Sequence, residues 1–447
     1  MKSRTPKVLH EVLGRPMLQH VIDAVMPLKP SGIITVVGNG AEEVKQRFST
    51  EGISFVLQKQ LLGTGNAVAV ARRHIGRGAV LVLNGDGPLI TTKTLRILVR
   101  NHLKRGNILS FLSFYDESLA GYGRVIRDKA GRVSAIAEDR HVSSADRKQF
   151  TELNGGVYLM EAEALQYLGR IRKNRRSGEY YLTDIVSIIA RSGKGLDAYE
   201  CPAEDILGVN SRHDLSVVSG IMRKRINREW MNRGVTFIDP DTTVVHSMVS
   251  LGMDTIVYPN TYLEGSTRIG KGCVIYPGSR VLNSLVGDGV MVKDNSLIED
   301  SRVGDGASIG PCAHLRPQSV IGRRAKIGNF VEVKKSSIGE GAKASHLTYL
   351  GDAMVGADVN IGAGTITCNY DGTNKYRTVI EPGVFIGSDT QLVAPVKIGR
   401  GAYVAAGATV TRDVPPGALA ISRVPQKNLD DWVQRKNSAT AGRKGRK

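Results

Sequence analysis

The segment 343–352, "KASHLTYLGD", contains the side chain best suited to acid–base chemistry in this sequence, His346. An imidazole titrates near neutral pH, so it can remove a proton from an amine. Three cations stand in nearby coils of the repeat described below: Arg316 in "HLRP", Lys334 in "VEVKK" and Lys375 in "CNYDGTNKYRTV". Cations of this kind hold phosphate groups. Together the four residues predict a site that deprotonates an amine on a phosphorylated substrate.

A second candidate site lies in the amino-terminal half. Asp86 in "LVLNGDGPL" comes at the end of an apolar run that reads as a buried strand. A carboxylate there can hold a magnesium ion that bridges nucleotide phosphates, although an Asp after a strand can also cap a turn or helix. In "QKQLLGTGNA", Gly63 and Thr64 are expected at a tight turn that opens a helix.

Residues 1–209 alternate apolar strands with helical stretches, which predicts an α/β doubly wound domain. "GIITVVGNG" and "AVLVLNGDGPL" have the composition of buried parallel strands, and "LGTGNAVAVARRHI" between them has helical spacing. Ligands of such sheets bind at the carboxyl ends of the strands. Residues 210–234 then form a linker, in which apolar residues at steps of three or four predict one amphipathic helix over 211–233.

From residue 235 to about 427 the period changes to six. A six-residue repeat cannot form a helix face, and it is typical of a left-handed parallel β-helix in which three hexapeptides close each coil. The repeat breaks at 368–379, which predicts an extruded loop, and coils of this type commonly assemble as trimers. The repeating aliphatic positions are Val303, Ile309, Leu315, Ile321, Ile327 and Val333, then Ile338, Ala344, Leu350, Val355, Ile361 and Thr367, and finally Ile380, Ile386, Leu392, Ile398, Val404 and Val410.

Composition excludes several classes of protein. No run of 18 apolar residues is present, so no membrane span is expected, and four separated cysteines without a C-x-x-C pair suit a reducing cytoplasm. The net charge of +19 could indicate nucleic-acid binding, but aromatic residues make up only 5% and the basic residues are scattered. Pockets for phosphorylated small molecules explain the charge better, and we expect no nucleic-acid partner. The basic tail, residues 428–447, is expected to be disordered.

The chain resembles a known family in six segments: "LRPQSVIG", "IGNFVEVKK", "SHLTYLGD", "NIGAGTITCNYDG", "IGSDTQLVAPV" and "ALAISRVPQ". The family is the bacterial bifunctional enzyme of UDP-N-acetylglucosamine synthesis, in which glucosamine-1-phosphate N-acetyltransferase is joined to N-acetylglucosamine-1-phosphate uridylyltransferase. The resemblance runs from residue 1 to about 427. It implies acetyl-CoA and UTP as co-substrates, Mg²⁺ as cofactor, a homotrimer and a product used for peptidoglycan and lipopolysaccharide.

By this resemblance, His346 is the general base that deprotonates the sugar amine as the amine attacks the thioester of acetyl-CoA. Arg316 and Lys334 would hold the sugar phosphate. The resemblance further implies sugar contacts for Tyr349, Asn360 and Lys375, and contacts with acetyl-CoA or its reacting carbonyl for Ala363, Asn369, Tyr370, Ser388, Ala406 and Arg423. For the small residues, simple packing of the coil is the alternative.

In the amino-terminal half the resemblance implies Asp86 and Asn210 as the magnesium ligands. It assigns uracil recognition to Gln58, Gly63 and Thr64, sugar binding to Gly123, Glu138 and Asn154, and a phosphate contact to Lys7.

Three features depart from the family pattern. The family's first strand and glycine-rich nucleotide loop do not precede Met1, and Asn84 and Gly87 stand where Tyr and Val are usual. A central strand leaves unpaired backbone groups on both neighbours when it is absent, each costing about 1–3 kcal/mol. We therefore expect that Met1 is an internal methionine of a chain longer by roughly 15–20 residues. The 447-residue chain is expected to acetylate its substrate but to transfer little uridylyl.

Three other functions fit parts of the sequence. Hexapeptide acyltransferases of the serine or dipicolinate type lack the amino-terminal half and the "CNYDG" loop. A non-catalytic scaffold would not need His346 together with Arg316, Lys334 and Lys375. An acetyltransferase with an inactive nucleotidyltransferase half is the closest alternative.

Overall fold

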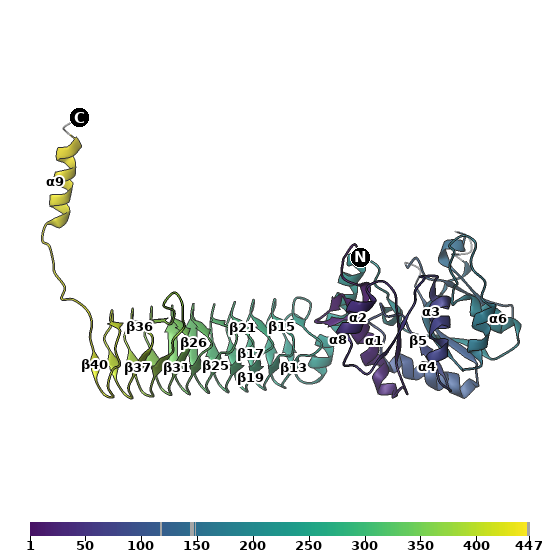
Figure 1. Cartoon of the computed structure of the whole chain (residues 1–447), viewed down its shortest axis with the longest axis horizontal. Coiled ribbons are helices and arrows are strands. Elements are labelled where there is room, and N and C mark those ends of the chain that lie inside the picture. Colours follow the sequence, from purple (N-terminus) through teal and green to yellow (C-terminus); the bar gives the residue numbers. More distant parts are fainter. Residues whose placement is uncertain (117–118, 144–146, 148, 445–447) are drawn as a thin grey trace. The chain divides into compact units, whose positions relative to one another are not determined.

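The computed structural model describes residues 1–116, 119–143, 147 and 149–444, and Figure 1 shows the chain. The chain divides into two compact units. The first unit comprises Met1–Glu229 with Val245–Ser247, and the second comprises Trp230–Val244 with Met248–Lys447. Each unit has its own architecture and its own candidate site.

The first unit is built on a six-stranded mixed sheet. Its strands are β5 (Val80–Val82), β6 (Leu109–Tyr115), β7 (Arg124–Arg127), β8 (Val133–Ala137), β9 (Glu152–Met160) and β10 (Leu196–Glu200). β10 runs parallel to β6, whereas β9 is antiparallel to both β5 and β6. The α/β class predicted from the sequence is confirmed, and the sheet is mixed because the long strand β9 runs through its middle in the opposite direction.

Helices cover both faces of this sheet. Alternate side chains of β6 point to opposite faces: Phe111 joins the apolar cluster of Ile185 and Ile189, and Phe114 joins that of Leu95 and Leu98. The first cluster involves α3 (Thr64–Ala71) and α6 (Asp184–Arg191), and the second involves α1 (Met17–Val25) and α4 (Thr92–Arg105). This arrangement confirms an α/β layer structure.

Two further strands, β3 (Ile34–Val37) and β4 (Ser54–Leu57), pair in parallel as a separate two-stranded sheet beside helix α2 (Ala41–Arg47). Within the described residues β5 pairs only with β9, and β3 pairs only with β4. The strands of the α/β unit thus lie in separate sheets rather than in one continuous sheet. The remaining regular elements of this unit are η1 (Lys7–Leu9), β1 (Glu11–Val12), β2 (Arg15–Pro16), η2 (Met26–Leu28), η3 (Arg72–His74), η4 (Asp139–His141), η5 (Ala164–Arg170) and α7 (Ala203–Ile206).

The helix expected over 211–233 is observed as α8 (Arg212–Asn232). Most of α8 belongs to the first unit, since that unit extends to Glu229. Arg225 on α8 explains this placement, because its guanidinium donates to Leu89 O at 2.7 Å and to Asp205 Oδ1 at 2.8 Å.

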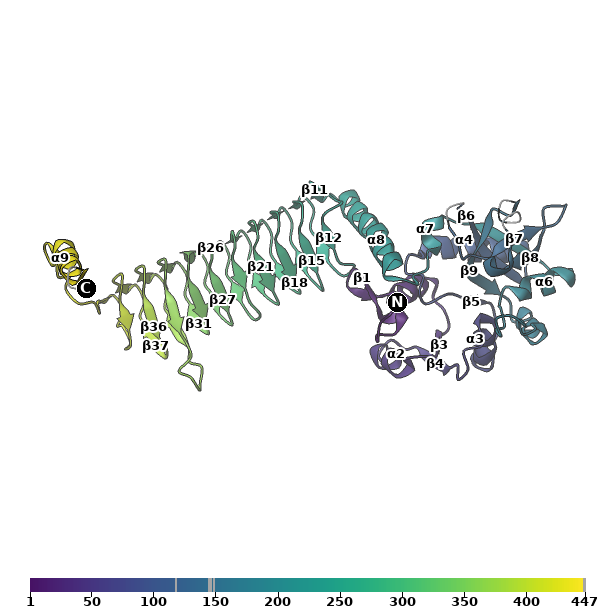
Figure 2. The same cartoon turned by 90° about the horizontal axis from the view of Figure 1, so that it is seen from above.

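The second unit is a solenoid of short parallel strands stacked into three sheets, which we call faces one, two and three. Figure 2 shows the stacked coils. Face one comprises β11 (Thr236–Phe237), β14 (Ile256–Val257), β17 (Val274–Ile275), β20 (Met291–Val292), β23 (Ser308–Ile309), β26 (Lys326–Asn329), β29 (Lys343–His346), β32 (Asn360–Ile361), β35 (Phe385–Ile386), β38 (Tyr403–Val404) and β40 (Leu419–Ala420).

Face two comprises β12 (Val244–Val245), β15 (Tyr262–Glu264), β18 (Arg280–Leu282), β21 (Leu297–Glu299), β24 (His314–Leu315), β27 (Glu332–Lys334), β30 (Tyr349–Gly351), β33 (Ile366–Cys368), β36 (Gln391–Val393) and β39 (Thr409–Val410). Face three comprises β13 (Ser250–Leu251), β16 (Arg268–Ile269), β19 (Leu285–Val286), β22 (Arg302–Val303), β25 (Val320–Ile321), β28 (Ser337–Ile338), β31 (Ala353–Val355), β34 (Thr378–Ile380) and β37 (Val396–Ile398).

The residues of the six-residue repeat point into the solenoid. Ile327, Ala344, Ile361, Ile386 and Val404, for example, stack on consecutive strands of face one and are at most 3% exposed. Stacked identical positions form a continuous apolar core without a ligand-sized interior, as the repeat predicted. The predicted interruption is also observed: residues 369–377 separate β33 from β34 and protrude as a loop, visible in Figure 2.

The carboxyl-terminal tail differs from the expectation. Residues Trp432–Lys444 form helix α9, although the segment was expected to be disordered. Gln, Arg, Lys and Ala are good helix formers, which explains a helix even where residues 432–438 are exposed to solvent. In the described part of the chain, no helix combines the length and apolar character needed to cross a bilayer.

We predict that Ile269→Ala destabilises the solenoid by about 2–5 kcal/mol, because the truncation leaves a cavity between Leu251 and Val286. Urea unfolding followed by circular dichroism measures the loss. Arg268→Ala on the same strand is the matched control, since this side chain is exposed and its loss should change stability by less than about 0.5 kcal/mol. Equal effects of the two substitutions would contradict the assigned inward column.

Candidate active sites

One corner of the solenoid collects residues that are far apart in the sequence. Asn329 and His346 are register partners on β26 and β29. Ala363, Ser388 and Ala406 stand two residues after Ile361, Ile386 and Val404, which continue the same stack. The predicted base and three predicted acetyl-CoA contacts therefore form one column on consecutive coils, which we call the corner column.

His346 lies at the end of β29 with its side chain exposed. Its Nδ1 atom is 2.5 Å from Asn329 Oδ1. Its backbone carbonyl accepts a hydrogen bond of 2.7 Å from the Thr348 hydroxyl, and the next residue, Leu347, donates its N–H to Asn329 O at 3.0 Å. These bonds fix the ring on the outer surface of the corner and leave Nε2 directed away from the Asn329 contact.

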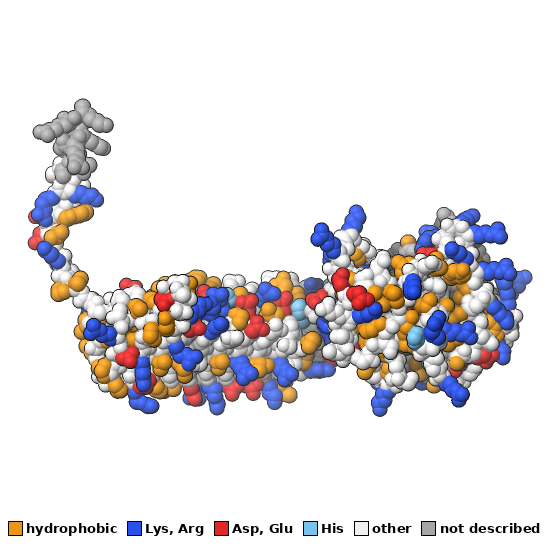
Figure 3. All heavy atoms as spheres, viewed as in Figure 1, with side chains coloured by type: hydrophobic (Ala, Val, Ile, Leu, Met, Phe, Trp, Pro, Cys, Tyr) orange, Lys and Arg blue, Asp and Glu red, His pale blue; other side chains and the backbone are white. Residues whose placement is uncertain are grey.

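Two of the predicted cations lie together on face two, and the third interacts with one of them from the extruded loop. Arg316 and Lys334 occupy equivalent positions on neighbouring coils, because Leu315 pairs with Val333. Lys375 reaches Lys334 from the extruded loop. Lys and Arg side chains gather on the solenoid close to this loop (Figure 3).

Electrostatics in this cluster favour an anion. Repulsion by Lys375 is the main cause that lowers the pKa of Lys334, with burial and Arg316 contributing further. Glu332 balances only one cation: it accepts from Arg316 Nη1 at 2.9 Å, and this hydrogen bond raises the Arg316 pKa. An anionic group placed between Lys334 and Lys375 would relieve the remaining repulsion.

The other residues of the predicted acetyltransferase set take varied places. Tyr349 lies on face two as the register partner of Glu332, and Asn360 lies on face one between Lys343 and Phe385. Asn360 and the cations are thus on different faces of a single chain.

The remaining residues that are predicted to contact acetyl-CoA are held by local bonds. Asn369 donates its amide to Asp352 Oδ2 at 2.5 Å, and Tyr370 bridges to Lys375 across the loop hairpin. Arg423 donates Nη1–H to the Ala406 carbonyl at 3.0 Å, which ties the segment after β40 to the corner column.

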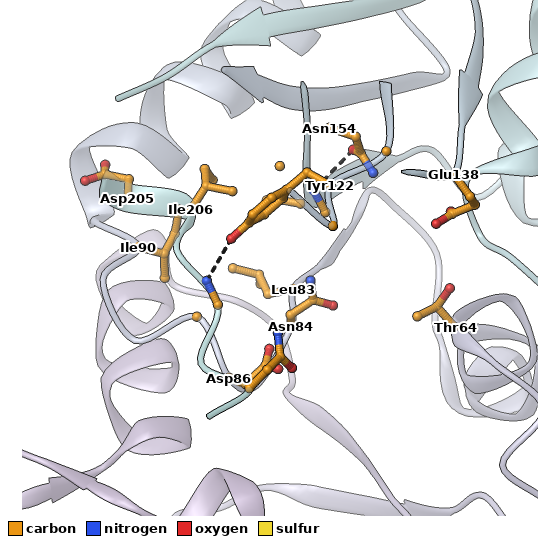
Figure 4. A pocket seen from close by; sticks show the side chains of 18 of the residues that line it. Thr64, Leu83, Asn84, Asp86, Ile90, Tyr122, Glu138, Asn154, Asp205 and Ile206 are labelled. Atoms are coloured by element: carbon orange, nitrogen blue, oxygen red, sulfur yellow. Dashed lines mark hydrogen bonds between the residues drawn. The ribbon is translucent and has the colours of Figure 1, made fainter. Parts of the chain in front are cut away.

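The first unit contains a cavity of about 330 Å³ (Figure 4). Most residues predicted for nucleotide and sugar binding line it. These are Thr64, Asp86, Gly123, Glu138, Asn154 and Asn210. Figure 4 shows Asp86 on one side of the cavity, Asn154 on the opposite side, and Glu138 and Thr64 along a third.

The two predicted metal ligands come together through Lys7. Its ammonium group forms a short ion pair with Asp86 and donates to Asn210 Oδ1 at 2.6 Å. A backbone bond from Val209 N–H to Asp86 O at 3.0 Å joins the two segments. Asp86 lies four residues beyond the last residue of β5, in a turn and not at the strand end that the sequence suggested.

The turn predicted before α3 is observed, and it needs its glycine. Gly63 has φ of +92°, and a Cβ atom there would lie 2.7 Å from Tyr180 O. Thr64 opens α3, and its hydroxyl accepts the Leu182 N–H at 3.1 Å. Gln58 lies behind this turn, where its amide donates to Gly63 O at 3.2 Å.

The side of the cavity that is predicted to bind the sugar is held by polar contacts. Glu138 accepts a hydrogen bond of 2.5 Å from the Thr183 hydroxyl, and Asn154 Oδ1 accepts from Gly156 N–H at 3.1 Å. Tyr122 also lines the cavity, its hydroxyl accepting from Gly208 N–H at 3.1 Å. Burial raises the pKa of Tyr122, so its hydroxyl stays protonated and can donate to a ligand.

The two departures from the family pattern face this cavity. Asn84 and Gly87 both line it, and Asn84 lies beside Asp86 in Figure 4. The Asn84 amide nitrogen lies where a Cβ at Gly156 would be only 2.6 Å away, so the glycine makes room for it.

Some functional neighbours were missed by sequence reasoning. Asn329, Glu332 and Asp352 each contact a predicted site residue across one coil, at sequence separations of 17, 16 and 17. The coil length of about three hexapeptides could have pointed to them. Tyr122 carried a weaker signal, since it stands between two glycines in "GYGRV".

Comparison with protein families assigns both units. Residues 1–148 match the MobA-like NTP transferase domain, 238–322 match the GMPPB C-terminal domain, and 377–412 match the bacterial transferase hexapeptide repeat. These matches define the class: a transferase with an α/β nucleotidyltransferase domain followed by a left-handed β-helix.

Relatives extend over both units. The bifunctional protein GlmU of Thermodesulfovibrio yellowstonii is 44% identical over 98% of this chain and 96% of the relative. The GlmU proteins of Shouchella clausii and Thermoanaerobacter pseudethanolicus are 46% and 48% identical, each over 97% of this chain and over 96% and 95% of their own lengths. The chain belongs to the GlmU family of bifunctional proteins, which confirms the resemblance read from the sequence.

The cation cluster yields a prediction about Lys334. In Lys375→Met, loss of the neighbouring charge raises the Lys334 pKa, so less of its amine is neutral and an amine-acylating reagent should label it severalfold more slowly. Mass spectrometry of the labelled peptide at a fixed mildly alkaline pH measures the rate. Lys375→Arg keeps the charge and should label as the unmodified chain does. Equal labelling in all three proteins would show that the two side chains do not interact.

Proposed function

We propose that the chain makes UDP-N-acetylglucosamine in two steps. The solenoid transfers the acetyl group of acetyl-CoA to glucosamine-1-phosphate, and the α/β unit transfers uridylyl from UTP to N-acetylglucosamine-1-phosphate with release of pyrophosphate. Membership of the GlmU family supports both activities. The single observation that best supports the acetyl transfer is the corner column, where His346 stands in line with Ala363, Ser388 and Ala406.

In the acetyl-transfer step, His346 Nε2 takes a proton from the amine of the sugar. The amine nitrogen attacks the thioester carbonyl, a new C–N bond forms, the C–S bond breaks, and the thiolate of coenzyme A leaves. Arg316, Lys334 and Lys375 hold the phosphate of the sugar as a cationic cluster. Small residues of the corner column let the acetyl-CoA chain lie close to the coil.

In the uridylyl-transfer step, the cavity of the first unit binds the nucleotide and the sugar. Thr64 lies at the end proposed for uracil, and Glu138 and Asn154 lie at the end proposed for the sugar. Asp86 and Asn210 are proposed as the ligands of Mg²⁺, which commonly takes one or two protein oxygens together with phosphate oxygens. The Lys7 ammonium supports this fit, since a cation already contacts both oxygens. When bound, the ion supplies positive charge that neutralises the phosphates.

We predict that His346→Ala lowers the rate of acetyl transfer about 10²- to 10⁴-fold, because the general base is lost. Thiol release from acetyl-CoA measures the rate. The melting temperature should not change, since this side chain is exposed. Asp86→Asn in the other unit is the control and should keep acetyl transfer. A near-normal rate in His346→Ala would remove this residue from the proposed mechanism.

The acetyl-transfer site is proposed to be completed by neighbouring copies in a homotrimer. Phe330 and Leu347, which directly follow Asn329 and His346, are 59% and 61% exposed, so large apolar side chains flank the corner column. The filled interior of the coil leaves only its outer surface for substrates.

Light scattering of the purified protein is expected to give three times the mass of one chain. Phe330→Lys should shift the mass toward the monomer and lower acetyl transfer together. A fully active monomer would contradict this assembly.

A further inference from the structure

Asn329 is the closest polar neighbour of the proposed base among the contacts described above. Its Oδ1 atom lies 2.5 Å from His346 Nδ1, across a register pair of strands β26 and β29. Gly328 makes this approach possible, because a Cβ atom there would lie 1.9 Å from Ser345 O. Both backbones are thus held close at the point where the two side chains meet.

The chemistry of the two atoms fixes the proton. A carboxamide oxygen can only accept a hydrogen bond, so the ring nitrogen facing it must carry the hydrogen. In a neutral imidazole, a hydrogen on Nδ1 leaves the lone pair on Nε2. That lone pair is what a base needs to accept a proton from the substrate amine.

We propose that Asn329 is a positioning residue for acetyl transfer: it holds the Nδ1–H tautomer of His346 and keeps Nε2 free as the proton acceptor. The inference rests on the proposed role of His346 as the base. Asn329 itself touches no reacting atom and acts through the imidazole.

The charged residues near His346 cannot replace Asn329 as the acceptor for Nδ1–H. On the strands paired with β29, Lys326 precedes Asn329 by three residues on β26, and β32 consists of the uncharged Asn360 and Ile361. On β29 itself, Lys343 precedes the imidazole by three residues. A lysine ammonium donates hydrogen bonds and accepts none, so neither lysine can hold an Nδ1–H.

Two substitutions of Asn329 test the proposal. Asn329→Leu keeps a similar shape but removes the acceptor, and kcat for acetyl transfer should fall about 10- to 100-fold with little change in KM for the sugar phosphate. Asn329→Asp keeps an oxygen acceptor at this position, so its kcat should be close to that of the unmodified chain. The added carboxylate should also move the acid limb of the pH profile of kcat/KM upward by about one pH unit.

A purely structural role predicts a different pattern. Asn329→Leu would then lower the melting temperature together with activity, and Asn329→Asp would leave the acid limb in place. A normal kcat in Asn329→Leu, or no rescue by Asn329→Asp, overturns the proposal. His346→Ala separates the two hypotheses: if this variant is inactive while Asn329→Leu is normal, only the positioning role fails, and if both are normal, the proposed base fails as well.

The tautomer can be observed without an activity assay. Nitrogen-15 NMR of the full chain labelled at histidine, with His346→Ala to assign the signal, should show hydrogen on Nδ1 and a free lone pair on Nε2. Asn329→Leu should lose this preference. Hydrogen on Nε2 in the unmodified chain would mean that the amide nitrogen of Asn329 faces the ring, and it would overturn the proposal.

Discussion

The backbone hydrogen bonds between successive coils determine which side chains of the solenoid share a column, and the proposed acetyl-transfer site depends on that register. Successive members of the series Asn329, His346 and Ala363 are 17 residues apart. They lie on consecutive coils because Ile327, Ala344 and Ile361 stack beside them. A shift of one residue in this pairing would exchange the side chains that point into the solenoid with those that point to solvent. The same apolar column that stabilises the coil therefore also aligns the chemistry.

Opposing charge effects organise the cation cluster that is proposed to hold the phosphate. Stacking brings Arg316 and Lys334 together on adjacent coils, and the extruded loop adds Lys375. Such a cluster costs free energy in the absence of an anion, which the lowered pKa of Lys334 reflects. The solenoid makes this arrangement tolerable, because strands β24 and β27, which position Arg316 and Lys334, each pair with a strand on both sides. Because the fold already holds the cations close together, a phosphate that binds between them relieves their repulsion without a further rearrangement.

The sequence predicted repeated structure well and contacts between repeats poorly. Six-residue spacing identified the inward positions, the coil class and the loop at 369–377, because burial of the aliphatic residues is encoded locally. The contact between Asn329 and His346 depends on coil length, which changes from 18 to 17 residues along the chain, for example from Ile309–Ile327 to Ile327–Ala344. The six-residue spacing alone therefore does not identify which residue of the neighbouring coil contacts His346.

The α/β unit was predicted less completely for a related reason. The turn at Gly63 carried a local signal, since a positive φ and a close carbonyl require glycine. The antiparallel course of β9 carried none, because a strand that is buried on both faces shows the same burial whichever way it runs. Helix α9 was missed since its composition favours both a helix and a solvated tail.

Charge balance in the first unit explains why Lys7, Asp86 and Asn210 lie together although they come from three distant segments. An ammonium group between a carboxylate and a carboxamide oxygen satisfies both acceptors, so this position favours positive charge. A divalent cation makes the same demand on the same two oxygens and would compete with the ammonium for them. Lys7 would then be released toward the phosphate groups beside the ion, where its charge is again compensated.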